Sequence, residues 1–122
     1  KAETLGSACF INDGKGNFNK VDLPDALQLA PVYSFAPAMA AGNAGWIASG
    51  NFYGVIPYEG RYDAMLPTVF SYVKSKKKIQ AGQVIPDVDG EVRDAKWIRY
   101  KDGNQVLVLA RNNGSLVFLK RD

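Results

Sequence analysis

The chain has 122 residues, of which 47% are hydrophobic and 22% charged, so it has the length and composition of about one domain with a packed core. Its net charge of +3 is too small to indicate a polyanion partner, and no apolar run approaches the roughly 20 residues of a membrane span. The absence of histidine and the single cysteine exclude an internal disulfide, a thiolate metal cluster and a histidine base.

Short β-branched or aromatic runs, separated by Gly, Asn, Asp and Pro, predict an all-β fold of short antiparallel strands. Cys9 lies in the first run and is interpreted as a buried structural thiol. The best helical candidate, Asp25–Ala30, is flanked by prolines and is too short to be more than a turn. We expect strands at Gly6–Ile11, Asn17–Asp22, Val32–Ala40, Gly45–Phe52, Thr68–Lys74, Lys77–Gly82, Val92–Tyr100, Gln105–Asn112 and Ser115–Lys120.

The predicted turns carry residues that tolerate a positive φ. Asp13-Gly14, Asp102-Gly103 and Asn113-Gly114 each fit a tight hairpin. A fourth hairpin holds the lysine-rich run Lys74–Lys78, whose charges protect a strand end from pairing with other chains. We favour this solvated hairpin over a nucleic-acid site, which would bind with a steep dependence on salt. We therefore expect no nucleic-acid partner.

Two apolar runs, Val106–Ala110 and Trp46–Ala48, are typical of strands that are covered on both faces. Each is followed by a turn and a more alternating strand, which favours radially stacked blades over a simple sandwich. The side chains expected to be largely buried between sheets are Trp46, Ile47, Phe70, Trp97, Ile98, Val106 and Val108.

Four segments carry a resemblance to a known family: Phe10–Phe18 with its Asn-Asp-Gly hairpin, Ser49–Ala64, Asp89–Asp94 and Leu109–Ser115. Together they resemble the C-terminal blades of FG-GAP/VCBS-type β-propellers, especially the large secreted ones of Bacteroidetes-like bacteria. The resemblance implies a single propeller fragment of about two to three blades. Residues 1–23 would form a partial blade, 32–82 a full blade and 92–122 a partial blade. It also implies an extracellular, periplasmic or outer-membrane-associated location.

Such repeats usually hold calcium in an acidic loop, but the corresponding segment here, Ala36–Gly45, contains no carboxylate. Calcium takes six to eight oxygen ligands, several of them charged, so we expect no metal and no cofactor. Asp87, Asp89 and Glu91 remain as weak metal candidates beside the alternative of a turn with surface charges. Three blades are too few to close a propeller. We therefore expect either a longer protein, as the start at Lys1 also indicates, or copies that associate to cover open sheet edges.

The long segment between Phe52 and Thr68 is the candidate recognition loop, because long loops are often binding loops. Its candidate binding residues are Asn51, Tyr53, Tyr58, Arg61, Tyr62 and Asp63. In a competing interpretation, which we favour slightly, the tyrosines are buried over the end of a blade and Arg61 pairs with Asp63, Glu59 or Asp94. Either way, the main hypothesis is a non-enzymatic binding or scaffold module with a protein or glycan partner.

The alternative hypothesis is a carbohydrate-active enzyme, because two carboxylates can hydrolyse a glycoside without histidine. The pairs available in the sequence are Glu59 with Asp63 and Glu91 with Asp94. Spacing along a loop does not give a distance in space, so the sequence does not choose a catalytic pair.

Overall fold

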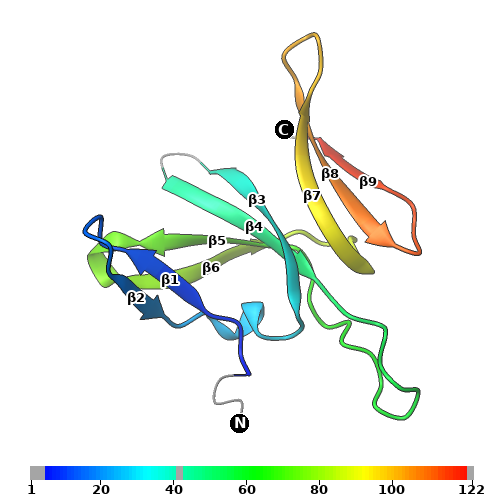
Figure 1. Ribbon diagram of the computed structural model, residues 1–122. Coiled ribbons are helices and arrows are strands. Elements are labelled where there is room, and N and C mark those ends of the chain that lie inside the picture. Colours follow the sequence, from blue (N-terminus) through cyan, green and yellow to red (C-terminus); the bar gives the residue numbers. More distant parts are fainter. Residues whose placement is uncertain (1–4, 41–42, 121–122) are drawn as a thin grey trace.

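A computed structural model describes residues 5–40 and 43–120, and within these ranges the chain is all-β, with no α-helix (Figure 1). The prediction of short antiparallel strands is confirmed. The strands are β1 (Cys9–Asn12), β2 (Phe18–Val21), β3 (Val32–Ala40), β4 (Asn43–Gly50), β5 (Thr68–Val73), β6 (Lys78–Val84), β7 (Glu91–Arg99), β8 (Gln105–Asn112) and β9 (Val117–Lys120). Two 3₁₀ helices, η1 (Asp25–Leu27) and η2 (Lys74–Lys76), are single turns.

All predicted strands are present, and their ends differ by a few residues. At the starts of β1 and β9, side chains take over backbone hydrogen bonds. The backbone of Ser7 exchanges two hydrogen bonds of 2.9 Å with the side chain of Gln28, so β1 starts only at Cys9. The carbonyl oxygen of Ser115 accepts a hydrogen bond from Arg111 Nε at 3.0 Å, and β9 starts at Val117. Local side-chain contacts of this kind compete with the sheet ladder.

The strands form three antiparallel sheets in which sequence neighbours pair: β1-β2, β3-β4-β5-β6 and β7-β8-β9. The four-stranded sheet is the middle layer, with the β1-β2 hairpin over one face and β7-β9 against the other (Figure 1). Within the described ranges these sheets form neither a closed barrel nor a closed propeller. No helix in this part of the chain is long and apolar enough to cross a membrane.

The interface between β3-β6 and β7-β9 is built from small and aliphatic side chains. Its buried residues are Ala36, Ala38, Ile47, Val88, Val92, Ala95, Leu107 and Leu109. Short side chains on β3 let the neighbouring backbones approach closely, and Trp97 Nε1 donates a 2.7 Å hydrogen bond to the Pro37 carbonyl across the layers. These contacts position the start of β7 beside the end of β4.

A second cluster lies between the hairpin, the η1 turn and the opposite face of the middle sheet. Its buried residues are Leu27, Ala30, Ala48, Met65, Phe70 and Ile79. Cys9 packs against this cluster but is only partly buried, and its burial raises the pKa of the thiol. The sequence interpretation of Cys9 as a buried structural thiol is therefore only partly confirmed.

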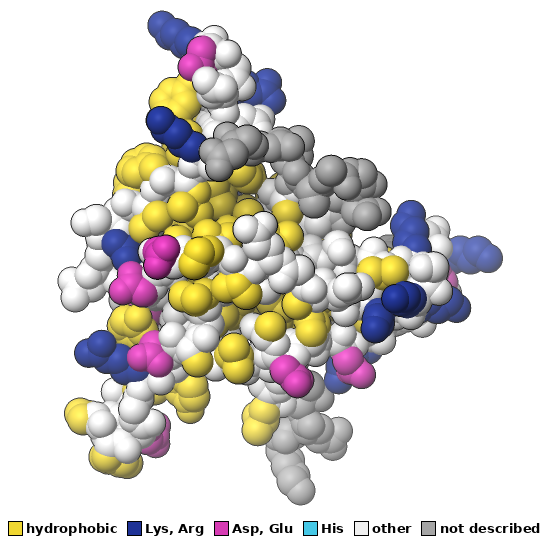
Figure 2. Space-filling view, turned by 180° about the vertical axis from the view of Figure 1, so that it is seen from behind, with side chains coloured by type: hydrophobic (Ala, Val, Ile, Leu, Met, Phe, Trp, Pro, Cys, Tyr) yellow, Lys and Arg dark blue, Asp and Glu magenta, His cyan; other side chains and the backbone are white. Residues whose placement is uncertain are grey.

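The burial predictions are confirmed for Val106, Ile47 and Phe70. They are wrong for Ile98, which is 48% exposed, and for Trp46, which is 39% exposed. Trp97 and Val108 are partly buried. In β7, Ile98 alternates with core-facing residues and so lies on the outer face of its sheet. Figure 2 shows the molecule from behind, with hydrophobic side chains across the middle and most charged side chains toward the rim.

Candidate functional site

The candidate recognition loop is closed at its base by one buried asparagine. Asn51 is 2% exposed and has a φ of 81°, a left-handed conformation that asparagine tolerates better than most residues. Its Nδ2 donates to the carbonyls of Met65 (2.8 Å) and Gly90 (3.0 Å), and its Oδ1 accepts from the Met65 amide (3.0 Å). An isolated antiparallel bridge between Phe52 and Tyr62 narrows the loop further. The base of the loop is thereby fixed to the start of β7.

The first residue of β7, Glu91, is 3% exposed and joins β7 to the loop and to β8. Its Oε1 accepts from the Tyr53 amide at 2.9 Å and from Arg93 at 2.6 Å, while Oε2 accepts from Asn112 Nδ2 at 2.6 Å. The Tyr53 amide, the Asn112 side chain and the Arg93 charge hold the pKa of Glu91 below its ordinary value. Glu91 is therefore a fixed anion that orients its neighbours.

Arg93 occupies a β-bulge, where the register of β7 against β8 shifts. Its Cζ lies 4.1 Å from the ring centroid of Tyr33 and 5.8 Å from that of Phe52. With the Glu91 ion pair and two aromatic faces around it, the Arg93 guanidinium is held in one position. Bulges commonly re-aim a side chain in this way.

Arg111, near the end of β8, is held by Asp89, which lies in the turn before β7. Its Nη1 donates to the Asp89 carboxylate at 2.8 Å. Gly90 has a φ of 94°, and a Cβ there would lie 3.0 Å from Arg111 Cδ, so glycine permits both the turn and the close approach of the arginine. The Asp89 and Arg111 pair thus depends on the glycine between Asp89 and Glu91.

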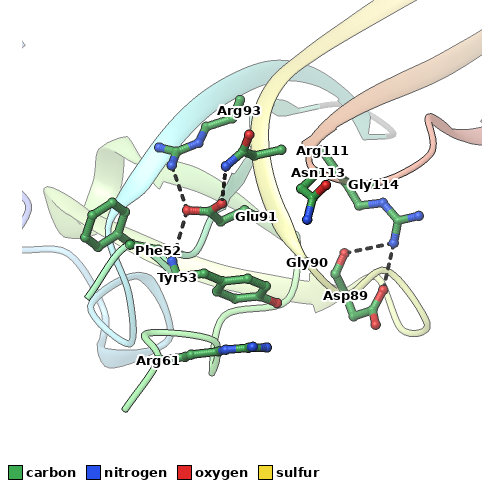
Figure 3. Close-up of a pocket in the computed structure, with 12 residues that line it drawn as sticks. Phe52, Tyr53, Arg61, Asp89, Gly90, Glu91, Arg93, Arg111, Asn113 and Gly114 are labelled. Carbon is green, nitrogen blue, oxygen red and sulfur yellow. Dashed lines mark hydrogen bonds and ion pairs between the residues drawn. The ribbon is translucent and has the colours of Figure 1, made fainter. Parts of the chain in front are cut away.

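These elements surround an open pocket of about 640 Å³ between the loop, the start of β7 and the β8-β9 turn (Figure 3). Tyr53 and Arg61 form its loop side, and the Arg61 Cζ lies 5.0 Å from the centroid of the Tyr53 ring. In Figure 3 the Tyr53 hydroxyl and the Arg61 guanidinium both extend toward the side of the pocket where Asp89 lies. The lining is mostly polar: Phe52, Tyr53, Gly54, Arg61, Asp89, Gly90, Glu91, Arg93, Arg111, Asn112, Asn113 and Gly114.

The structure brings together only some of the loop residues named from sequence. Tyr53 and Arg61 line the pocket, and Asn51 holds the loop base. Tyr58 is 85% exposed and Tyr62 is 50% exposed, outside the lining. The expectation of buried tyrosines is therefore wrong for these two.

Asp63 and Glu59 are also exposed and lie outside the pocket lining. Among the described residues, Arg61 forms no ion pair, and Asp94 pairs with Lys96. The expected carboxylate partner of Arg61 is therefore not found there. Its aromatic neighbour Tyr53 takes the place of a carboxylate.

The weak metal candidates do not form one cluster. Asp87 is exposed with a φ of 61°, Asp89 pairs with Arg111, and Glu91 is surrounded by donors. Within residues 5–40 and 43–120, no group of three or more acidic, Cys or His side chains is arranged to hold a metal ion. Of the loop predicted to lack a calcium site, Ala36–Ala40 lies in β3 and Asn43–Gly45 in β4. Residues 41 and 42 lie outside the described residues.

Arg93, Arg111, Asn112 and Asn113 line the pocket but were not identified from sequence as site residues. They reach the loop only through contacts between segments far apart in the chain, such as Tyr53 with Glu91. A local signal existed in Arg111-Asn112-Asn113-Gly114, where an arginine precedes a tight turn that resembles a family motif. That signal indicated a hairpin and not a ligand.

No protein-family model, no curated protein and no solved structure matches this chain. The site is therefore interpreted from its own geometry.

Proposed function

We propose that this chain is a non-enzymatic binding module, built from propeller-like blades of a protein that acts outside the cytoplasm. We propose further that the pocket between Tyr53, Arg61 and Arg111 is its recognition site. The ligand class that fits best is a carbohydrate that carries a carboxylate, such as a uronic acid residue.

Three features of the fold support the blade assignment. The strands of each sheet pair in sequence order, as in an antiparallel meander. The sheets stack as layers, and β3, the first strand of the middle sheet, packs against β7, the first strand of the next. The repeating unit of a propeller is a four-stranded sheet, and the middle sheet has four strands.

The observation that carries the ligand class is the state of the three pocket arginines. Arg93 is paired with Glu91, and Arg111 with Asp89. Arg61 is exposed and lies over the Tyr53 ring, with no ion pair to any described residue. A guanidinium in this setting presents a planar fork of donors to a carboxylate. Arg93 and Arg111 are thus part of the pocket wall, and Arg61 is available to the ligand.

The polar lining favours a carbohydrate over a protein partner. Protein recognition depends on buried apolar anchors at the centre of an interface. Here the walls are mainly guanidinium groups, carboxylates, amides and glycine backbone, with Phe52 and Tyr53 as the aromatic members. Such walls offer many donors and acceptors to the hydroxyl groups of a sugar.

The carboxylates support binding without catalysis. Glu91 has its oxygens occupied by donors and a lowered pKa, so it does not serve as a general acid. The other named carboxylates, Glu59, Asp63 and Asp94, are exposed. A glycosidase would lose turnover of oligosaccharides in the double variant Glu59→Gln/Asp63→Asn. We expect no turnover of oligosaccharides by the parent protein or by the double variant. Measurable turnover by the parent would refute this proposal.

The binding test compares oligogalacturonate with the same oligomer after reduction of its carboxyl groups, by isothermal titration calorimetry. We expect the acidic oligomer to bind and the reduced one to bind at least about tenfold more weakly, because it lacks the charge-assisted hydrogen bonds. Arg61→Ala should lower the affinity by roughly 10- to 100-fold.

Arg99→Ala is the matched control, because Arg99 is exposed on β7 outside the pocket lining. It should bind like the parent. Equal affinity for acidic and reduced oligomers, or equal loss in the Arg61 and Arg99 variants, would contradict a carboxylate site at Arg61. Circular dichroism of each variant separates loss of binding from loss of fold.

A further inference from the structure

The middle sheet leaves an aromatic surface uncovered on the side of the β1-β2 hairpin. Phe35 on β3 is 55% exposed and Trp46 on β4 is 39% exposed. Both pack against Phe70, with ring centroids 6.0 Å and 5.7 Å away. The hairpin is short, and beside it remains a largely apolar groove of about 400 Å³, lined by Ala8, Cys9, Phe10, Ile11, Leu23, Phe35, Trp46, Phe70, Tyr72 and Ile79.

The groove borders an open strand edge. Among the described strands β1 pairs with β2 alone, and residues of β1 line the groove while those of β2 do not. Figure 1 shows β1 on the side of the hairpin nearer to β3 and β4. Edge amides and carbonyls beside an exposed apolar surface favour docking of another β-element. The groove lies beside the buried contact that joins the hairpin to the middle sheet, and residues of both line it.

Two exposed apolar side chains, Phe118 and Ile98, lie at the other end of the stack, on the outer face of β7-β9. Phe118 pairs with Val108 in the register of β8 and β9, and Ile98 pairs with Val106 in that of β7 and β8. These residues alternate with the core-facing Leu107 and Leu109, so they face away from the middle sheet. Val106 is buried and Val108 partly buried, and the exposed Lys96 and Lys120 share this face in the strand register. Phe118 is 58% exposed and Ile98 is 48% exposed. Among the described strands, β9 has a free edge as well.

We propose that copies of this chain associate head to tail, with the outer face of β7-β9 of one copy packed over Phe35 and Trp46 of the next. The interface already present in the chain is an example of the same sheet stacking, in which the inner face of β7-β9 covers the other face of the middle sheet. A second copy is the natural occupant because the chain carries both the aromatic groove and the exposed Phe118 and Ile98, at opposite ends of its layers. The contact joins two different surfaces, so it extends into longer assemblies unless rotation closes a ring. This inference does not depend on the ligand site.

The first test is sedimentation velocity of the full chain from low to high micromolar concentration. The average mass should rise above the 13.3 kDa of one copy as concentration increases. Fluorescence of Trp46, measured in a Trp97→Phe background, should shift to the blue over the same range as the side chain becomes covered. A mass of one copy at every concentration overturns the proposal.

Single variants show whether the contact joins two different surfaces. Phe35→Lys removes the groove surface and Phe118→Lys removes the outer face of β7-β9, so each alone should be monomeric. Phe18→Lys is the matched control, because Phe18 is 64% exposed on β2 and outside both surfaces, and it should associate like the parent.

A mixture of Phe35→Lys and Phe118→Lys should form a dimer that does not grow, because each variant keeps the surface that the other lacks. Association of either single variant at the parental level, or a mixture that stays monomeric, refutes the head-to-tail contact. Circular dichroism checks that each variant is folded. If Phe118→Lys does not fold, Ile98→Lys tests the same face.

Discussion

The two faces of the middle sheet bury hydrophobic surface in different ways. Against β7-β9, the sheet presents Ala36, Ala38 and Ile47, and short side chains let a second sheet lie closely along β3 and β4. On the opposite face, Phe35, Trp46 and Phe70 fill space with rings, yet the short hairpin leaves two of the three substantially exposed. Residue hydrophobicity alone therefore does not determine burial, which depends on whether a second layer is available.

The largest expected effect comes from the covered face. Leu109 is fully buried, so Leu109→Ala should lower the free energy of unfolding by about 2–5 kcal/mol through lost burial and a cavity. Val108→Ala is the matched control, because Val108 is only partly buried on the other face of β8, and it should cost about 1 kcal/mol or less. Urea denaturation measures both. Equal losses in the two variants would mean that β8 does not have one core face.

The next effect is the loss of stability in acid that depends on Glu91, at the start of β7. The pKa of Glu91 is lowered in the folded chain, so its stabilisation is fully present above the unfolded pKa, about 4.3, and is lost as pH falls through the folded value. Glu91→Gln should therefore melt lower than the parent at neutral pH and lose less stability on acidification. Thermal denaturation from pH 7 to about pH 2 tests this.

Asp13 also has a lowered pKa, because Asn17 and the Lys15 amide donate to it, but it is present in both proteins. Its contribution cancels when the parent and the Glu91→Gln variant are compared. If the melting temperatures of the parent and of Glu91→Gln differ by the same amount at every pH, Glu91 does not stabilise the fold as an anion.

The smallest effect compares the two tryptophans, one on each face. Trp97 reaches across the covered interface to the Pro37 carbonyl, so Trp97→Phe should cost about 1 kcal/mol for the lost hydrogen bond. Trp46→Phe should cost less, because it keeps an aromatic ring beside Phe70 at an exposed position. Chemical denaturation at low protein concentration distinguishes them. A larger cost for Trp46→Phe would indicate that the half-covered face is better packed than its exposure implies.

The sequence was sufficient for the strands because their signals are local. Asp-Gly and Asn-Gly steps mark the hairpins, and short β-branched runs mark the strands between them. A run of apolar residues does not show which of its alternate side chains face the core. Val106–Ala110 contains no polar residue that would mark the outer face. The structure assigns Leu107 and Leu109 to the core facing the middle sheet. Val108 lies on the other face.

The candidate site was only half predictable for the same reason. Tyr53 and Arg61 are distinctive residues in an unusual loop, and both line the pocket. The partner of the Tyr53 amide, Glu91, lies 38 residues away in sequence. Sequence proximity favoured Asp63 as the partner of Arg61, whereas the fold places Arg61 over an aromatic ring. Contacts across that distance depend on how the sheets stack, which local patterns do not encode.

The closed base of the recognition loop has a consequence for engineering. Asn51 and the bridge between Phe52 and Tyr62 join the two ends of the loop, so the segment between them is a closed loop with fixed ends. For such a loop, doubling its length adds only about 0.6 kcal/mol of closure entropy. A foreign peptide inserted near the exposed Tyr58 should therefore be displayed with its ends held together, while the sheets beneath keep their packing. The fold offers a display scaffold for constrained peptides.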